Sequence, residues 1–193
     1  QASPHEAAAI PGVTVVSGTR DRAGIVRAVM DLTQSQSAPA MLVSEIGDCR
    51  VYEELPSEGT AERTRAYVKI EDGCENFCSY CKVPYVRGPV RSRDFEHIRE
   101  EVRRLAARGF REIVLTGIDM GAYGRDFGGS PSLADVLEMA ANAQGIARVR
   151  VSSVDPTDVT DRLLDIMGSE PAVCPHLHVP LQSGDDHVLE RMN

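Results

Sequence analysis

Three cysteines that stand within eight residues are the strongest chemical signal in the sequence. Cys74, Cys78 and Cys81 have the spacing C-x3-C-x2-C. Thiolates are the usual ligands of iron–sulfur clusters, and a [4Fe–4S] cluster normally takes four of them. Because this loop supplies only three, one iron would stay open to a substrate or cofactor, as in catalytic metal sites. The spacing therefore predicts a [4Fe–4S] cluster with one open iron.

Structural zinc is the alternative interpretation of the same three cysteines. Such a site is closed by four cysteine or histidine ligands, and the fourth would be Cys49, Cys174 or a histidine. The missing fourth ligand on the loop favours the cluster. We interpret Cys49 as an incidental thiol of a linker and Cys174 as a buried thiol. We interpret His176 and His178, which share one face of an expected strand, as residues of the site wall or the core.

Composition and charge narrow the class of protein. The chain has 193 residues of which 42% are hydrophobic, enough to bury a core. We find no apolar run of about 18 residues and no secretory signal pattern at the start, so we expect a soluble cytoplasmic protein without a membrane segment. The clustering of three of the five cysteines suits a reducing compartment. The net charge of −8 argues against a nonspecific nucleic-acid binder but leaves an RNA substrate open.

From residue 64 onward, apolar strand patterns alternate with amphipathic helix patterns. We expect strands at 66–70, 112–116, 148–152 and 176–181. We expect helices at 95–108, 133–143, 159–167 and 185–192. Alternation at this spacing predicts parallel βα units and an α/β fold.

Residues that could bind a cofactor follow the carboxyl ends of these expected strands. The cysteines follow the first strand, Gly117 the second, Ser153 the third and Gln182 the fourth. Because parallel α/β barrels bind ligands at the carboxyl ends of their strands, these residues are expected to share one site. Gly117 and Ser153 also have ordinary interpretations as turn residues, and these stay open.

The residues before this region predict a small α/β piece and a linker. Residues 1–44 contain an expected strand at 13–16 and a helix, capped by Thr19 or Asp21, that runs to about Leu32 with Val26 and Val29 on its apolar face. Residues 45–63 are rich in Ser, Pro, Glu and Gly and are expected to be a linker. Residues 64–193 would form the main unit.

Four segments in this order resemble the methylthiotransferase branch of the radical S-adenosylmethionine (SAM) enzymes. They are VKIEDGC (68–74), YCKVPYVRGPVRSR (80–93), LTGIDMGAYGRD (115–126) and PHLHVPLQSG (175–184). The resemblance implies that residues 64–193 are an incomplete (βα)6 radical SAM barrel and that residues 1–44 are the end of the family's amino-terminal domain. It also implies a second, auxiliary [4Fe–4S] cluster in the full-length enzyme, with ligands that would precede Gln1, and a carboxyl-terminal RNA-binding domain.

The resemblance further implies that the cluster and SAM carry the chemistry, without a catalytic side chain. The amino and carboxylate groups of SAM would bind the open iron, and reductive cleavage of SAM would give a 5′-deoxyadenosyl radical. Tyr80, Gly117, Ser153 and Gln182 would contact SAM, with Tyr80 beside the adenine and Gly117 near the amino group.

The segment at 117–126 is most similar to enzymes that add a methylthio group to N6-threonylcarbamoyladenosine at position 37 of tRNA. Related enzymes act on N6-isopentenyladenosine in tRNA or on an aspartate of a ribosomal protein, and a non-catalytic module stabilised by zinc or a cluster is an alternative from another class. The implied partners are tRNA and an electron donor protein of the flavodoxin or ferredoxin type, and we expect a monomer. Arg87, Arg91 and Arg93 could meet RNA phosphates or form structural salt bridges.

Overall fold

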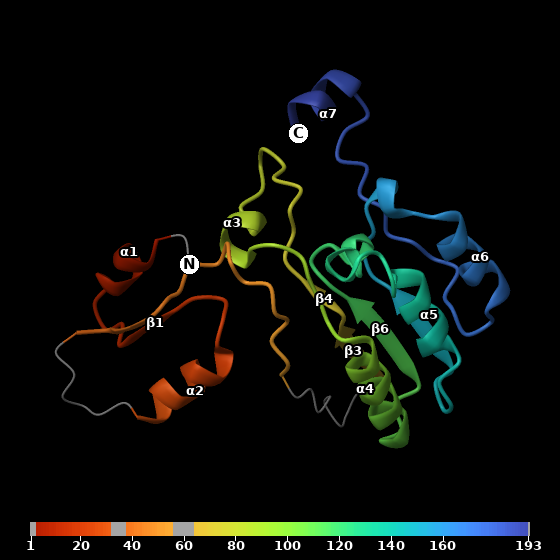
Figure 1. The fold of residues 1–193 in the computed structure, drawn as a ribbon, viewed down its shortest axis with the longest axis horizontal. Coiled ribbons are helices and arrows are strands. Elements are labelled where there is room, and N and C mark those ends of the chain that lie inside the picture. Colours follow the sequence, from red (N-terminus) through yellow and green to blue (C-terminus); the bar gives the residue numbers. More distant parts are fainter. Residues whose placement is uncertain (1–2, 32–37, 56–63, 193) are drawn as a thin grey trace.

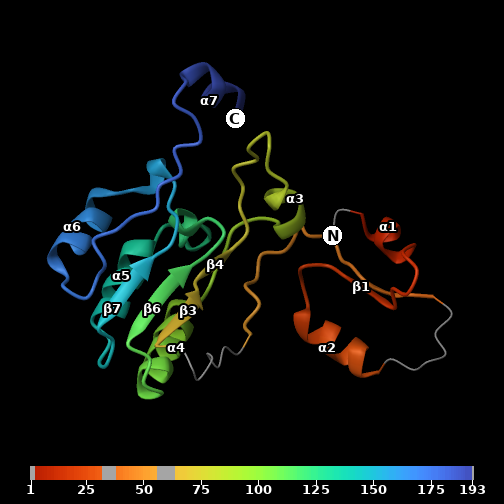
Figure 2. The ribbon, with the colours of Figure 1, turned by 180° about the vertical axis from the view of Figure 1, so that it is seen from behind.

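A three-stranded parallel sheet forms the centre of the chain. The computed structural model describes residues 3–31, 38–55 and 64–192. The strands β3 (Arg65–Lys69), β6 (Glu112–Thr116) and β7 (Arg148–Val151) lie in the order β3–β6–β7, as Figure 2 shows; Figure 1 shows the molecule from the opposite side, with β3 and β6 labelled. Val68, Ile113, Leu115 and Val149 are fully buried in these strands. These four side chains share one face of the sheet, whereas Tyr67, on the other face of β3, is 50% exposed.

Three helices form a layer beside the sheet. They are α4 (Phe95–Ala107), α5 (Leu133–Ala141) and α6 (Asp161–Ser169), and α5 contacts both of the others. Asp94 caps α4 by accepting hydrogen bonds from the backbone N–H groups of Glu96 and His97, and Ser132 and Asp135 form a capping box at α5. Strand–helix alternation from residue 64 to residue 169 therefore agrees with the sequence prediction, with α6 beginning two residues later than expected.

The predicted fourth strand at 176–181 is wrong in extent. This segment touches the sheet through one isolated parallel bridge, Ser153 to His178, and a second bridge joins Val149 to Val173 just before it. Pro175 and Pro180 lack the backbone N–H that a continuous ladder needs. Within the described residues, the parallel sheet therefore ends at β7, and the chain continues to α7 (Asp186–Met192), a helix that the sequence did predict.

The amino-terminal part contains a two-stranded parallel sheet and two helices. Its elements are α1 (Pro4–Ala8), β1 (Val15–Ser17), α2 (Arg22–Met30) and β2 (Ala40–Leu42). The side chain of Asp21 caps α2 by accepting a hydrogen bond from the backbone N–H of Gly24 at 2.9 Å. Val26 and Val29, predicted to be buried, are 63% and 52% exposed because no described element covers their face of α2. Leu32, the expected end of the helix, lies outside the described residues.

Two short antiparallel strands enclose the cysteine loop. β4 (Glu71–Asp72) pairs with β5 (Arg91–Ser92), and the short helix α3 (Val83–Arg87) lies between them in sequence. Neither the strands nor this helix was predicted. The expected linker has no helix or strand in its described part, 45–55, yet Ile46 and Cys49 are buried there. The rest of that linker, 56–63, lies outside the described residues.

None of the helices in the described part of the chain is long and apolar enough to cross a membrane.

Candidate metal centre

The three cysteines of the loop line one cavity of about 180 Å³. The other walls come from the ends of β6 and β7 and from the segment after the sheet, and include Ile118, Asp119, Ser153, Asp155 and Gln182. Tyr80 also lines the cavity. The structure therefore brings together the cysteines, Tyr80, Ser153 and Gln182, which the sequence placed at separate strand ends.

Backbone contacts at both ends of the loop fix the position of the first cysteine. The backbone N–H of Cys74 donates to the carbonyl of Gly88 at 3.0 Å, across the β4–β5 pair. Gly73 has a φ of +103°, and a Cβ atom at this position would lie 2.0 Å from the carbonyl oxygen of Pro89. Only glycine satisfies both conditions. Close backbone approach at Gly73 thus sets where the Cys74 thiol points.

Replacing Gly73 with alanine is expected to destabilise the loop. The left-handed backbone costs a residue with a Cβ about 1–2 kcal/mol, and displacing the Pro89 carbonyl adds a cost on the order of 2 kcal/mol. Gly128→Ala is the matched control, since Gly128 has a φ of +83° but nothing within 4 Å of the added Cβ. Urea unfolding would measure both. Equal losses in the two variants would contradict the proposed clash at Gly73.

The Cys74 thiol lies beside a buried carboxylate. Its Sγ atom is 3.6 Å from Oδ2 of Asp119, and the Asn76 side-chain amide donates to the same oxygen at 3.2 Å. Burial, and then the negative charge of Asp119, raise the pKa of Cys74 to about 11. Metal binding requires the thiolate and displaces this proton. Asp119, only 8% exposed, was not singled out from the sequence.

Glu71 holds the loop that carries Asp119. Its Oε2 atom accepts hydrogen bonds from the backbone N–H groups of Ile118 at 2.8 Å and Asp119 at 2.7 Å. The side chain is fully buried, and this burial raises its pKa to about 8. A Cβ on Gly117 would lie 2.7 Å from the same oxygen. Gly117 therefore leaves space for the Glu71 side chain. Ile118 and Asp119 line the cavity, and Gly117 does not.

A hydrogen bond joins the cysteine loop to the segment after the sheet. The Tyr80 hydroxyl donates to Oε1 of Gln182 at 2.8 Å. Gln182 has a φ of +64°, a strained backbone conformation for a residue with a side chain. The bridge between Ser153 and His178 holds this segment against the end of β7. Two of the four predicted cofactor-binding residues thus contact each other at the cavity.

The donor set fits a cluster. Three thiols line a common cavity, and within the described residues no group of three or more Cys, His, Asp or Glu side chains could hold a single metal ion. In an iron–sulfur cubane each thiolate binds a separate iron. Cys49, Cys174, His176 and His178 are not among the residues that line this cavity, and both histidines are exposed rather than part of a core.

Two of the three arginines near the loop form buried salt bridges. The Arg91 side chain is 4% exposed and lies 3.6 Å from Asp72. The Arg93 side chain is 9% exposed and pairs with Glu54 at 2.7 Å and with the buried Glu101. Of the two interpretations of these arginines, the structural one is correct for Arg91 and Arg93. Arg87 is 35% exposed and pairs with Asp72 as well.

Comparison with known proteins identifies the class to which this fold and this site belong. A sequence profile of the radical SAM superfamily matches residues 68–193, which include the parallel sheet and the cysteine loop. The chain therefore belongs to the radical SAM superfamily, whose members use a [4Fe–4S] cluster and SAM.

Within this class, the chain is similar to tRNA methylthiotransferases. It is 40% identical over 192 residues to the threonylcarbamoyladenosine tRNA methylthiotransferase MtaB of Bacillus subtilis, and 41% identical over 194 residues to MtaB of Thermotoga maritima. Both alignments cover 100% of this chain but only 42% and 43% of the relatives, so the chain spans less than half of their length. It is also 44% identical to a tRNA-2-methylthio-N(6)-dimethylallyladenosine synthase of Pelotomaculum thermopropionicum, over 73% of this chain and 31% of that enzyme.

A solved structure supports the fold. The radical S-adenosylmethionine methyltransferase TsrM of Kitasatospora setae, with tryptophan and the SAM analogue aza-SAM bound, superposes with a TM-score of 0.52 and 16% identity. The match covers 65% of this chain and 23% of TsrM. At this identity the likeness concerns the fold alone.

Proposed function

We propose that this chain forms the catalytic core of an enzyme that adds a methylthio group to N6-threonylcarbamoyladenosine at position 37 of tRNA. One observation carries the proposal: 40% and 41% identity with two enzymes of that name extends over the whole chain, including the amino-terminal part. The cavity with three thiols supplies the chemical site that a radical SAM enzyme requires.

In this proposal, each residue at the cavity has a binding or orienting role. Cys74, Cys78 and Cys81 would hold the cluster, which supplies the electron for reductive cleavage of SAM when it is bound. Tyr80 and Gln182, joined by their hydrogen bond, would hold the adenosyl end of SAM. We further propose that Ser153 donates a hydrogen bond to the ribose or carboxylate of SAM from the end of β7.

Asp119 and Gly117 have different roles in the same loop. The Asp119 carboxylate faces the cavity beside Cys74 and can pair with a cationic group of the cofactor. Gly117 would act indirectly, because its missing side chain lets Glu71 approach and orient the backbone of Ile118 and Asp119. This assignment replaces the expected direct contact of Gly117 with SAM.

The proposed activity also requires partners. A flavodoxin or ferredoxin would supply the electron, and tRNA would be the substrate. We propose that the protein acts in the cytoplasm and as a monomer. An auxiliary [4Fe–4S] cluster would bind ligands that precede Gln1. We propose the division into the end of an amino-terminal domain (1–44), a linker (45–63) and a radical SAM domain (64–193) on the same grounds.

Methylthiolation of N6-isopentenyladenosine, also called N6-dimethylallyladenosine, is the second candidate, because one observation favours it. The chain is 44–45% identical to four tRNA-2-methylthio-N(6)-dimethylallyladenosine synthases, over alignments of 128–141 residues. This identity is higher than the 40% and 41% to the two MtaB enzymes. These alignments cover only 66–73% of the chain. The identity of the core alone therefore does not separate the two substrates, and the match over the complete chain favours the threonylcarbamoyl one.

Mass spectrometry of tRNA nucleosides tests the assignment. The gene would be expressed in a bacterial host that lacks its own methylthiotransferases, and the digested tRNA analysed for both methylthiolated nucleosides. We expect 2-methylthio-N6-threonylcarbamoyladenosine, with none of the dimethylallyl product. The reverse result would assign the second candidate. If neither nucleoside forms while the purified protein cleaves SAM, the substrate is neither of these two tRNA nucleosides.

A further inference from the structure

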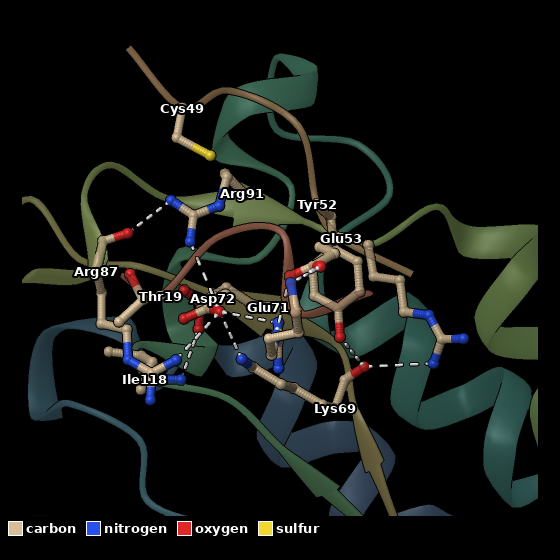
Figure 3. Close-up of polar contacts among 12 residues, drawn as sticks. Thr19, Cys49, Tyr52, Glu53, Lys69, Glu71, Asp72, Arg87, Arg91 and Ile118 are labelled. Atoms are coloured by element: carbon tan, nitrogen blue, oxygen red, sulfur yellow. Dashed lines mark hydrogen bonds and ion pairs between the residues drawn. The ribbon is translucent and has the colours of Figure 1, made fainter. Parts of the chain in front are cut away.

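A single buried carboxylate gathers four cationic side chains next to the cysteine loop. Asp72 is 3% exposed. Its Oδ2 atom lies 2.7 Å from the ammonium group of Lys69 and 3.6 Å from the guanidinium groups of both Arg87 and Arg91. Arg22 approaches the same oxygen at 4.0 Å. Figure 3 shows Lys69, Arg87 and Arg91 converging on Asp72.

The four cations come from two different parts of the chain. Lys69 precedes the cysteine loop, and Arg87 and Arg91 follow its last cysteine, so all three belong to the same unit as Asp72. Arg22 is the first residue of α2 in the amino-terminal part. Because Asp72 stands two residues before Cys74, its interaction with Arg22 links α2 to the backbone that carries the first thiol.

Further polar contacts fix how the two parts meet. The backbone N–H and Nε of Arg22 donate to the carboxylate of Glu53 at 2.6 Å and 2.9 Å. The Thr19 hydroxyl donates to the carbonyl of Val86 at 2.7 Å, at the end of the cysteine region. The Tyr52 hydroxyl donates to the carbonyl of Lys69 at 3.3 Å. Figure 3 shows Thr19, Tyr52 and Glu53 around Asp72, and these contacts give the junction a defined geometry.

Close backbone approach adds a steric constraint at the same junction. A Cβ on Gly88, which has a φ of +77°, would lie 2.6 Å from the carbonyl oxygen of Ile46. Ile46 and Cys49 are buried although they belong to a segment without helix or strand. The described residues 46–49 therefore lie against the cysteine region.

The amino-terminal part of this chain lies outside the region that matches the radical SAM superfamily. The superfamily profile begins at residue 68, whereas the similarity to the methylthiotransferases of Bacillus subtilis and Thermotoga maritima extends over the whole chain. Under the proposed function, SAM would be cleaved at the cavity of the cysteine loop, and the auxiliary cluster would bind ligands that precede the amino-terminal part. The position of this part relative to the loop would then set how the two clusters are placed for transfer.

We propose that Arg22 and Asp72 are positioning residues that hold the amino-terminal part in register with the cysteine loop, and that methylthio transfer depends on this register while SAM cleavage does not. The proposal rests on the proposed function for its catalytic consequence. The structural consequence, docking of α2 and of residues 46–54 against the β4–β5 pair, stands independently of the substrate.

Arg22→Gln tests the proposal in the cluster-loaded protein at its full natural length. Losing one partner of a nearly buried carboxylate weakens the junction, and a small misplacement of reacting groups is costly. We expect methylthiolation of tRNA to fall about tenfold or more, with SAM cleavage and iron content unchanged. Hydrogen exchange of residues 22–30 and 46–54 should become about tenfold faster, while exchange of β6 stays as in the wild type.

Arg27→Gln is the matched control in the same helix. The Arg27 side chain is 68% exposed and, in the described part of the chain, forms its ion pair with the exposed Asp21 at 3.4 Å. This variant should behave like the wild type in transfer, cleavage and exchange. Asp72→Asn should accelerate exchange in α2 as well, because it removes the carboxylate charge that Arg22 approaches.

Several results would overturn the proposal. These are unchanged exchange in Arg22→Gln, equal losses of SAM cleavage and methylthio transfer, or an Arg27→Gln variant with the same defects. Failure of the proposed function looks different: the wild type would cleave SAM without forming a methylthiolated nucleoside. In that case the exchange measurements still decide whether Arg22 and Asp72 hold the junction.

Discussion

Alanine in place of Cys78 is expected to abolish retention of the iron–sulfur cluster, and SAM cleavage with it. Cys74, Cys78 and Cys81 line one cavity, and we propose that these three thiolates bind the cluster. Removing one leaves two ligands for a group that normally takes four. After anaerobic reconstitution with iron and sulfide, the variant should contain almost no iron. Its reduced sample should lack the electron paramagnetic resonance signal of a cubane cluster.

Cys49→Ala and Cys174→Ala are the matched controls. Cys49 lines a different cavity, beside Arg22 and Asp72, and neither it nor Cys174 is among the residues around the three thiols. Both variants should retain iron, and SAM should shift the cluster signal in each of them as in the wild type. Loss of iron in either control would indicate that this cysteine is a ligand. It would then favour the closed site with four ligands over the cluster with an open iron. A cluster signal that ignores SAM in the wild type would contradict the open iron.

Local sequence patterns were sufficient to predict the sheet and its helices. Strand β6 is a short apolar run, and β3 and β7 alternate buried apolar residues with less buried ones. Helix α4 has an apolar stripe of Ile98, Val102 and Leu105 after the cap Asp94. These signals depend on neighbours within one element, so they can be read without knowledge of the fold. Placement of ligands at strand ends follows from parallel topology in the same way.

The contacts that organise the site could not be predicted, because they join residues far apart in sequence. Glu71 and Asp72 look like solvated charges between a strand and a loop, yet both are buried. Glu71 contacts a backbone 47 and 48 residues later, and Asp72 meets Arg22 from the amino-terminal part. β4 and β5 are only two residues long each, too short for a periodic pattern.

A sequence pattern also misled where proline opposed it. The alternation in residues 176–181 favoured a strand, but Pro175 and Pro180 limit its pairing to one bridge at His178. Gly117 is predicted to contact SAM because a strand-end glycine allows close approach. The structure shows the carboxyl of Glu71 close to this glycine, a neighbour that the sequence pattern did not indicate.

Glu71→Gln is expected to make the folded protein more stable at alkaline pH. Burial raises the pKa of Glu71 to about 8 from an ordinary value of 4.5. Between these two values the folded state binds more protons than the unfolded state, so the free energy of unfolding falls as pH rises through this window. At about 1.4 kcal/mol for each pKa unit, the loss is on the order of 5 kcal/mol. Glutamine has no charge to bury and avoids this loss.

Urea unfolding across pH 5–9 would measure the effect. The two proteins should have similar stability near pH 5, and the variant should be several kcal/mol more stable at pH 9. Glu71→Ala is the control, because it leaves the N–H groups of Ile118 and Asp119 without their acceptor. It should be destabilised by about 2–4 kcal/mol even at pH 5. Parallel pH profiles for wild type and Glu71→Gln would contradict the raised pKa.

The comparison with glutamine is direct because the second oxygen of Glu71 has no partner. Oε1 is buried without a hydrogen bond in the described structure, so the protonated carboxyl and the amide leave similar donors unpaired. What differs is the negative charge that wild-type Glu71 acquires above pH 8, next to Asp119 and Asp72. That charge would repel the carboxylate of Asp119, which lies beside Cys74. Glu71 itself holds Asp119 in this position through the backbone N–H of Asp119. Glu71→Gln should therefore also retain the cluster at a higher pH than the wild type.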